Sequence, residues 1–303
     1  MSIQLVPYSP DQFESLHRLV THPSLAHEFE LLQTPEGLGN LFADPFGRPD
    51  LQWLAYREGQ LAGFGLSLVL PSWQGTWSAI RIAVPEPHRR RGVGSALLEA
   101  SLERLRTSAP ECHEASIAAW IPNDAAGAFS LARGFRHSRY FWLMERPRGE
   151  PPAIEWPPGI ECRVFDGSER AFEDWNAVYN ASFAEHYHGV ISTVEVCRAV
   201  MARPEADPSG LILAYRDGRC VGFCRDDLHA TRGEVGVLGV APEARGIGLG
   251  RALVRWGVSW LERKEALRVT LMVDGENETA LSLYRSEGFE VARTREFWSR
   301  STS

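Results

Sequence analysis

The chain has 303 residues, of which 44% are hydrophobic and 23% charged, and its formal net charge is −7 at pH 7. On a prior of roughly 150 residues per domain this length predicts two domains, and the composition is that of an ordinary globular protein. The negative charge argues against a general nucleic-acid-binding protein, because such a protein needs a basic face.

The first half of the sequence alternates between strand-like and helix-like patterns. Two strands, 51–57 and 61–70, flank Glu58-Gly59-Gln60, which predicts a tight hairpin. A further strand at 77–84 leads into a glycine-containing loop. The other expected elements are a strand at 3–7, helices at 11–20, 35–42, 93–106 and 124–133, and strands at 115–120 and 135–145.

Proline and glycine dominate residues 147–159, where five prolines and two glycines occur. Such a segment sustains neither a helix nor a central strand. We therefore expect an interdomain linker at 147–158, between an N-terminal domain at 1–146 and a C-terminal domain at 159–303.

The same order of patterns returns after this segment. Strands at 211–215 and 220–226 flank a second hairpin signal, Arg216-Asp-Gly-Arg219, and a strand at 234–240 enters another glycine-containing loop. The remaining expected elements are strands at 160–165, 268–273 and 289–298, and helices at 168–183, 193–201, 249–263 and 278–286.

Two groups of residues recur at nearly constant spacing. The residues that align are Arg89, Gly92 and Gly94 with Arg245, Gly248 and Gly250, 156 positions apart, and Asn123, Gly134 and Phe135 with Asn277, Gly288 and Phe289, 154 positions apart. Because the offsets agree and the elements occur in the same order, the sequence predicts a duplicated α/β unit.

The loop from Val240 to Ala252 holds three glycines between a strand and a helix, and residues 84–96 form its counterpart. A helix that begins in such a loop presents unpaired N–H groups and the positive end of its dipole. Both loops are therefore candidate phosphate-binding sites.

This combination, an Arg-x-x-Gly-x-Gly loop followed by an asparagine and a Gly-Phe pair, resembles the GNAT superfamily of acetyl-CoA-dependent N-acetyltransferases in both halves. The resemblance implies two tandem α/β folds, each with a mixed, splayed sheet, that form a pseudo-dimer. It also implies direct transfer of acetyl from acetyl-CoA to a primary amine of a small molecule.

The resemblance places the pantetheine arm of acetyl-CoA along strand 234–240 and the pyrophosphate on the N–H groups of the loop. In the second half the implied acetyl-CoA-binding residues are Leu238, Gly239, Val240, Arg245, Gly246, Ile247, Gly248, Leu249, Gly250, Arg251 and Asn277. In the first half they are Ile82, Ala83, Val84, Arg90, Arg91, Gly92, Val93, Gly94 and Ser95.

Two side chains of the second half are candidate catalytic residues. Tyr284 occupies the position where family members place a phenol near the leaving sulfur, and a phenol of pKa about 10 suits a thiolate of about 8.5. Glu234, at the start of the strand, is a candidate base for the ammonium, acting directly or through water. A core tyrosine and an exposed strand-end carboxylate are the structural alternatives.

The first half has Ser78 and Ser130 at the positions of Glu234 and Tyr284. Serine is neither a base nor a useful acid at neutral pH without help. We therefore expect catalysis in the second domain and a degenerate first domain. A non-catalytic acyl-CoA-binding module is the alternative for the whole chain.

The second half contains Asn180-Ala-Ser-Phe-Ala-Glu-His186, Gly210-Leu-Ile-Leu-Ala214, Gly222-Phe223, His229 and Gly233-Glu-Val235. In these segments the sequence resembles the mycothiol synthase-like acetyltransferases among tandem family members, which implies a cysteinyl pseudodisaccharide as an alternative acceptor. Asp227 departs from that pattern, which has a lysine there. Candidate acceptor-binding residues are Asp227, His229 and, on an early helix, Glu36. No metal-ligand spacing is present, so we expect no metal.

No apolar run approaches the roughly 18 residues that a membrane span needs, and the first residues lack the features of a secretion signal. Five cysteines, scattered and odd in number, favour a reducing environment. We expect a cytoplasmic monomer with internal pseudo-symmetry, a small-molecule partner, and no nucleic-acid or membrane partner.

Overall fold

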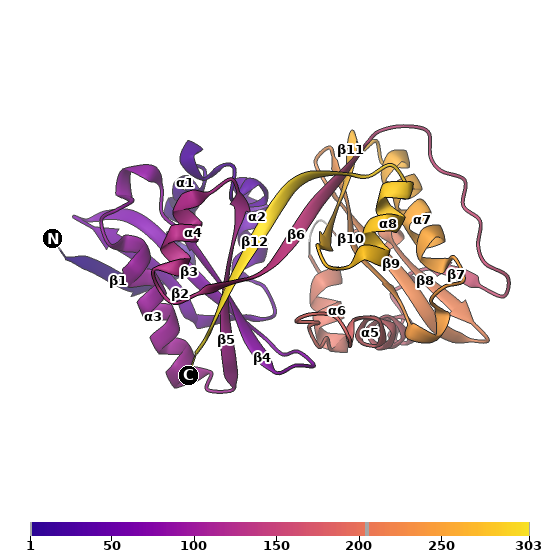
Figure 1. Ribbon diagram of the computed structural model, residues 1–303, viewed down its shortest axis with the longest axis horizontal. Coiled ribbons are helices and arrows are strands. Elements are labelled where there is room, and N and C mark those ends of the chain that lie inside the picture. Colours follow the sequence, from indigo (N-terminus) through magenta and orange to yellow (C-terminus); the bar gives the residue numbers. More distant parts are fainter. Residues whose placement is uncertain (1, 204–205, 303) are drawn as a thin grey trace. The chain divides into compact units, whose positions relative to one another are not determined.

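The protein was analysed as a computed structural model that describes residues 2–203 and 206–302. The chain forms two compact units, here called unit 1 (Met1–Arg139 with Arg295–Ser303) and unit 2 (Tyr140–Thr294). Figure 1 labels the helices and strands of both.

Unit 1 is built on strands in the order β1-β2-β3-β4-β5-β12. Neighbours from β1 to β4 are antiparallel, whereas β4 and β5 are parallel. The strands are β1 (Ile3–Pro7), β2 (Gly47–Arg57), β3 (Gln60–Leu70), β4 (Thr76–Ala83), β5 (Cys112–Ile121) and β12 (Glu290–Ser301), and the α-helices are α1 (Phe13–Val20), α2 (Pro35–Phe42), α3 (Val93–Ser108) and α4 (Asp124–Leu131).

Unit 2 repeats this arrangement with the order β7-β8-β9-β10-β11-β6, including a parallel β10–β11 pair. The strands are β6 (Arg136–Pro147), β7 (Glu161–Val164), β8 (Leu211–Arg216), β9 (Arg219–His229), β10 (Arg232–Val240) and β11 (Arg268–Asp274), and the α-helices are α5 (Glu169–Phe183), α6 (Val194–Met201), α7 (Leu249–Arg263) and α8 (Glu278–Ser286). The predicted mixed α/β fold and its duplication are confirmed.

Each unit takes its sixth strand from the other half of the sequence. Residues 141–147 of β6 pair with β11 in unit 2. The end of β12 carries Trp298, which is 2% exposed, into a core of unit 1 that includes Phe135. The compact units therefore divide β6 and β12, whereas the domain limits expected from the sequence keep β12 whole and separate only Pro147 from β6.

Both predicted hairpins have backbone conformations that explain their sequences. Glu58 and Gly59 between β2 and β3 have φ of 54° and 75°, and Asp217 and Gly218 between β8 and β9 have φ of 51° and 78°. Two successive residues with positive φ match the twist of the flanking strands, and glycine adopts this conformation without steric cost.

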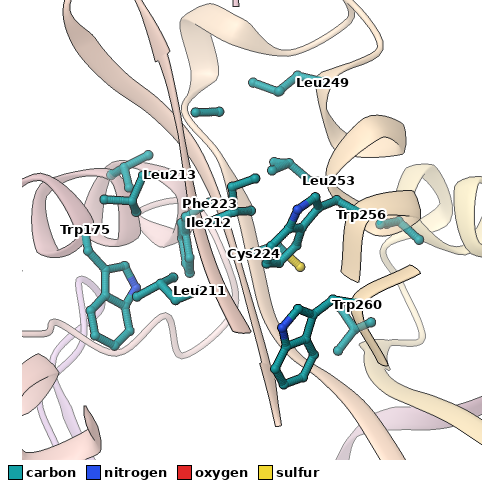
Figure 2. Packing of buried hydrophobic residues seen from close by; sticks show 14 of the residues in the cluster. Trp175, Leu211, Ile212, Leu213, Phe223, Cys224, Leu249, Leu253, Trp256 and Trp260 are labelled. Atoms are coloured by element: carbon teal, nitrogen blue, oxygen red, sulfur yellow. The ribbon is translucent and has the colours of Figure 1, made fainter. Parts of the chain in front are cut away.

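The core of unit 2 lies on both faces of its sheet. Figure 2 shows Trp256 and Trp260 of α7 on one side of the strands and Trp175 of α5 on the other. Every residue of β8 from Leu211 to Tyr215 is buried, as expected for a strand covered on both faces. The sheet of unit 2 is thus held between α5 and α7.

The exchanged strand predicts a specific stability effect. Replacing Trp298 by alanine should lower the free energy of unfolding by about 3–5 kcal/mol, because a buried indole is lost and a cavity remains. Urea denaturation measures this change. Trp73→Ala is the matched control, since Trp73 is 50% exposed, and should change stability by less than about 0.5 kcal/mol. If the two variants lowered the free energy of unfolding equally, β12 would not stabilise unit 1 through Trp298.

Candidate active site

The parallel strands β10 and β11 pair over only part of their length. Their register runs from Arg232 opposite Arg268 to Glu234 opposite Thr270. Among the described residues no pairing of the two strands continues beyond this point, although β10 extends to Val240 and β11 to Asp274. We call the opening that begins after Glu234 the fork.

A β-bulge at Gly236 accompanies the fork. Val235 pairs with Asp226 and Val237 with Arg225, so Gly236 is an extra residue in β10. A Cβ atom at Gly236 would lie 2.8 Å from Asp227 Oδ2 and 3.2 Å from an Arg225 guanidinium nitrogen. Any larger residue at this position would require the end of the Asp227 side chain to move, and a bulge of this kind redirects the strand.

The equivalent strand of unit 1 differs at this position. Ile80 stands where Gly236 stands in unit 2, and it is 2% exposed in the core. The β3–β4 register contains no shift, and β4 pairs with β5 as far as Ile80. Unit 1 thus has a regular strand, paired further along its length, where unit 2 has a bulge and a fork.

The two candidate catalytic residues lie on opposite faces of the unit 2 sheet. Asp226 points toward α7, since a Cβ at Gly257 would lie 2.6 Å from its carboxylate. Side chains alternate along a strand, so Asp227 faces α5, and Glu234 is its cross-strand neighbour. Tyr284 lies on the α7 side, where it interacts with Cys224, whose sulfur lies on the side of Trp256 in Figure 2.

Glu234 is partly buried within a small charged group. Its Oε2 lies 3.3 Å from an Arg232 guanidinium nitrogen and 3.8 Å from His229 Nε2, and its side chain is 22% exposed. Arg225 and Asp227 form an adjacent ion pair of 2.9 Å. The predicted acceptor-binding residues Asp227 and His229 are therefore close to the candidate base.

Tyr284 is partly buried against the core of unit 2, and its ring meets Phe289 edge-on at 6.1 Å between centroids. Burial, with a smaller contribution from the Cys224 thiol, raises the pKa of Tyr284 to about 12. The phenol therefore keeps its proton throughout the neutral and moderately alkaline range. It is a hydrogen-bond donor there and not a phenolate.

The loop before α7 has the geometry of a phosphate-binding turn. Gly246 and Gly248 have φ of 78° and 91°, and a Cβ at either would meet no atom within 4 Å. Gly248 is the N-cap of α7, and the first bond into the helix is from Ala252 N to Gly248 O. The preceding N–H groups of the first turn have no intrahelical partner.

The arginine of this motif has a structural role in both units. The Arg245 side chain donates to Val240 O and Ser182 O and pairs with Glu185. Arg89 likewise donates to Val84 O and Ser24 O. The guanidinium therefore fixes the loop to the strand end, which leaves main-chain groups for ligand contacts.

The loop of unit 1 keeps this conformation. Arg90 replaces the first glycine and has a φ of 60°, and Gly92 has a φ of 83°. At the start of α3, Arg133 donates to Ser95 and lies 3.9 Å from the centroid of the Phe129 ring. Unit 1 thus retains the backbone turn, while Ser95 at the start of its helix is bonded to Arg133.

The other predicted residues have definite positions. Asn277 caps α8, since its side chain accepts from Ala280 N at 3.1 Å. Ser78 and Ser130, at the positions of the two catalytic candidates, are fully buried, and their hydroxyls have no hydrogen-bond partner among the residues that the structure describes. Glu36 is exposed on the first turn of α2 in unit 1 and is not part of the unit 2 group.

The sequence analysis missed Gly236 and Arg225. The signal for Gly236 was present, because an isolated glycine inside a strand pattern indicates a bulge or a close approach. Arg225 carried no such signal. Its contact with the bulge depends on the register of β9 against β10, which only the folded chain defines.

Within the described residues no group of three or more His, Cys, Asp or Glu side chains is arranged to hold a metal ion. None of the helices in the described part of the chain has the length and apolarity to span a membrane.

A family model described as the acetyltransferase (GNAT) family matches residues 16–135 and again residues 171–289. The two matches lie on the two repeats and cover more than half of the sequence. The chain belongs to this family and is an N-acetyltransferase with two tandem GNAT folds.

Curated relatives include the mycothiol acetyltransferase of Thermomonospora curvata, 37% identical over 241 residues that cover 78% of this chain and 77% of the relative. The mycothiol acetyltransferase of Thermobispora bispora is 37% identical over 211 residues, which cover 66% of this chain and 68% of the relative.

Among solved structures, a GCN5-related N-acetyltransferase from Sphaerobacter thermophilus shares the fold with a TM-score of 0.76 at 22% identity, covering 99% of this chain and 96% of that chain. A tandem GNAT protein from the clavulanic acid biosynthesis pathway also has a TM-score of 0.76, at 17% identity, covering 100% and 99%.

The bulge predicts a sensitive position. Gly236→Ala should reduce the kcat/KM of acetyl transfer at least about tenfold, because the new methyl group displaces the Arg225–Asp227 pair and shifts β10. Steady-state assays with acetyl-CoA measure this effect. Gly236→Ile introduces the residue of unit 1 and should abolish activity.

The control for this substitution is Gly39→Ala, where a Cβ meets nothing within 4 Å. This variant should keep full activity. If Gly236→Ala were equally active, the bulge would have no role in the reaction.

Proposed function

We propose that unit 2 transfers the acetyl group of acetyl-CoA to a primary amine of a small-molecule acceptor, and that unit 1 is catalytically degenerate. One observation carries this proposal. Unit 2 combines the fork with Glu234 on one face and Tyr284 on the other, whereas in unit 1 the parallel strands stay paired as far as Ile80 and two buried serines occupy the equivalent positions.

The residues of the unit 2 loop fit the pyrophosphate of acetyl-CoA. The open space outside Gly246 and Gly248 and the N–H groups of the first turn of α7 form a main-chain site for an anion. The edge of β10 from Val237 to Val240 faces the fork and offers backbone groups to the pantetheine arm. Acetyl-CoA supplies the activated acetyl group.

Glu234 is the proposed base. The acceptor nitrogen must lose a proton before or as it attacks the thioester carbonyl carbon, and a carboxylate at the opening of the fork can accept that proton, directly or through water. The Arg232 guanidinium, 3.3 Å away, keeps the carboxylate oriented. The proton thus moves from the amine to Glu234 as the new C–N bond forms.

Tyr284 is proposed as the hydrogen-bond donor to the leaving sulfur. A phenol of pKa about 12 does not transfer its proton readily to a thiolate of about 8.5, because the transfer is uphill by about 3.5 pK units. It can still stabilise the thiolate through a charge-assisted hydrogen bond as the C–S bond breaks. This role is narrower than the acid role expected from the sequence.

A second candidate acceptor is the cysteinyl pseudodisaccharide implied by the mycothiol synthase-like relatives. Their identity of 37% to this chain favours it. Asp227, ion-paired with Arg225, opposes it, because that pattern has a lysine at this position. Comparing kcat/KM for this compound with a panel of simple primary amines decides between the two.

Removing the proposed base should slow the reaction. Glu234→Gln should lower kcat/KM at pH 7 by about 10²-fold or more, because general base catalysis typically contributes this much. A thiol-release assay with acetyl-CoA and a saturating amine measures the change. Glu290→Gln, an exposed carboxylate on β12, should have no effect. An unchanged rate in Glu234→Gln would remove this residue from the mechanism.

Removing the phenol should slow the same step. Tyr284→Phe should lower kcat by about 10²-fold while the affinity for acetyl-CoA stays nearly constant, since the donor acts on charge that develops in the transition state. Ser130→Ala in unit 1 should be silent. Loss of activity in Ser130→Ala would instead assign catalysis to unit 1.

The pH profile separates a hydrogen-bond donor from a titrating acid. Because the pKa of Tyr284 is raised to about 12, the phenol is protonated at every pH below that value. Wild-type kcat should therefore show no alkaline decline due to this group up to about pH 10. A decline centred near pH 8 to 9 that disappears in Tyr284→Phe would contradict this assignment.

A further inference from the structure

The parallel strands of unit 1 also separate, at a later position than those of unit 2. Ile80 opposite Ile117 is the last β4–β5 pair among the residues that the structure describes, although β4 extends to Ala83 and β5 to Ile121. Ile80 packs in a core that contains residues of α3, so the next residue, Arg81, faces the opposite side of the sheet. Arg81 therefore lies where the two strands begin to part.

A carboxylate from a distant segment contacts the end of β5. Glu28 Oε2 accepts a hydrogen bond from Trp120 N at 3.0 Å, and Trp120 lies beyond the last β4–β5 pair. Glu28 Oε1 lies 3.6 Å from a guanidinium nitrogen of Arg295. The Arg295 guanidinium in turn lies 5.2 Å from the centroid of the Trp120 ring. Glu28 thus makes a main-chain contact of the kind that a neighbouring strand makes elsewhere in a sheet.

Arg81 adds a buried cation to this opening. Its Nε is buried and has no hydrogen-bond partner in the described part of the chain. Burial lowers the pKa of Arg81 against the opposing effect of the negative charges of Glu28 and Asp44, so both carboxylates are near the guanidinium. A buried donor without an acceptor is unfavourable, and more so when it is charged. The opening therefore holds one carboxylate and has an unused donor for an anion.

The main chain holds Glu28 in place independently of its carboxylate. Glu28 N and Phe29 N both donate to Leu25 O, at 3.0 and 2.9 Å. Leu25 and Phe29 are 2% and 5% exposed, so buried side chains anchor this turn on both sides of Glu28. Truncation of Glu28 to alanine removes one methylene and one carboxylate, which together have the size of acetate. Because the turn is anchored, it does not readily collapse into the space left behind.

We propose that this opening in unit 1 is a binding site for a small carboxylate, and that Glu28 occupies it as an internal ligand. The donors are the main-chain N–H of Trp120 and the guanidinium groups of Arg81 and Arg295, which select an anion over an amine. The Glu28 side chain is 18% exposed, so solvent reaches it. An external carboxylate therefore competes with Glu28 for these donors. The proposal is independent of acetyl transfer by unit 2.

Chemical rescue of the full chain tests the proposal. In Glu28→Ala, sodium acetate should raise the thermal unfolding temperature in a saturable manner, because acetate that binds the folded protein stabilises it. Half of this increase should require at least about tenfold less acetate than in the wild type, where Glu28 competes for the site. Sodium chloride at equal concentration measures the general effect of salt and should give no saturable increase.

Three further variants separate the site from general effects of the salt. Glu28→Gln keeps the volume of the side chain and an acceptor for Trp120 N, so it should show no saturable response to acetate. Glu99→Ala removes an exposed carboxylate of α3 and should respond as the wild type does. Arg81→Met in the Glu28→Ala background should abolish the response, because it removes the buried cation.

A saturable acetate response of Glu28→Ala that Arg81→Met abolishes supports the site. Equal responses of Glu28→Ala and the wild type would overturn the proposal and leave an adventitious ion only. So would a response that survives Arg81→Met or occurs equally in Glu28→Gln. If Glu28→Ala is unfolded in chloride, refolding becomes the measurement: recovery of the folded state in acetate supports the site, and its absence rejects it.

Discussion

The opening of β10 away from β11 is the constraint on which the proposed site of unit 2 depends. Backbone N–H and C=O groups are normally paired inside a sheet, and here the edge of β10 beyond Glu234 faces the fork instead of a paired strand. The bulge at Gly236 lies just beyond this point, and any larger residue there would require the Asp227 side chain of the Arg225–Asp227 pair to move. In the proposed mechanism, the fork lets groups on the two faces of one sheet, Glu234 and Tyr284, act on the same reacting atoms.

The two repeats share the backbone conformation of the glycine loop but differ in the side chains at the position of Gly236. Unit 1 keeps the loop conformation even with Arg90 in the left-handed region, where a residue other than glycine costs about 1 kcal/mol or more. In unit 1 the parallel strands stay paired as far as Ile80, which fills the core at the position of Gly236. The phosphate-binding turn is therefore present in both units, whereas the groups for the proposed acetyl transfer are present in unit 2.

The proline-rich segment at 147–159 is fixed along α7. Its prolines exclude helix and central strand, and its carbonyl groups accept hydrogen bonds from α7. Strands β6 and β12 also join the two halves of the sequence, because each unit is completed by residues encoded in the other half. The boundaries of the compact units therefore differ from the boundaries of the sequence repeat.

The sequence by itself determined the duplicated α/β fold, both hairpins, the two glycine loops and the family, because these follow from periodicity, from residues with positive φ and from spacing along the chain. Only the tertiary structure decided which strand opens, that Arg225 and Asp227 lie on the bulge, that Trp298 completes the core of unit 1, and that burial raises the pKa of Tyr284 to about 12. Each of these depends on the register between strands or on packing between distant residues. The spacing of residues along a chain does not contain that information.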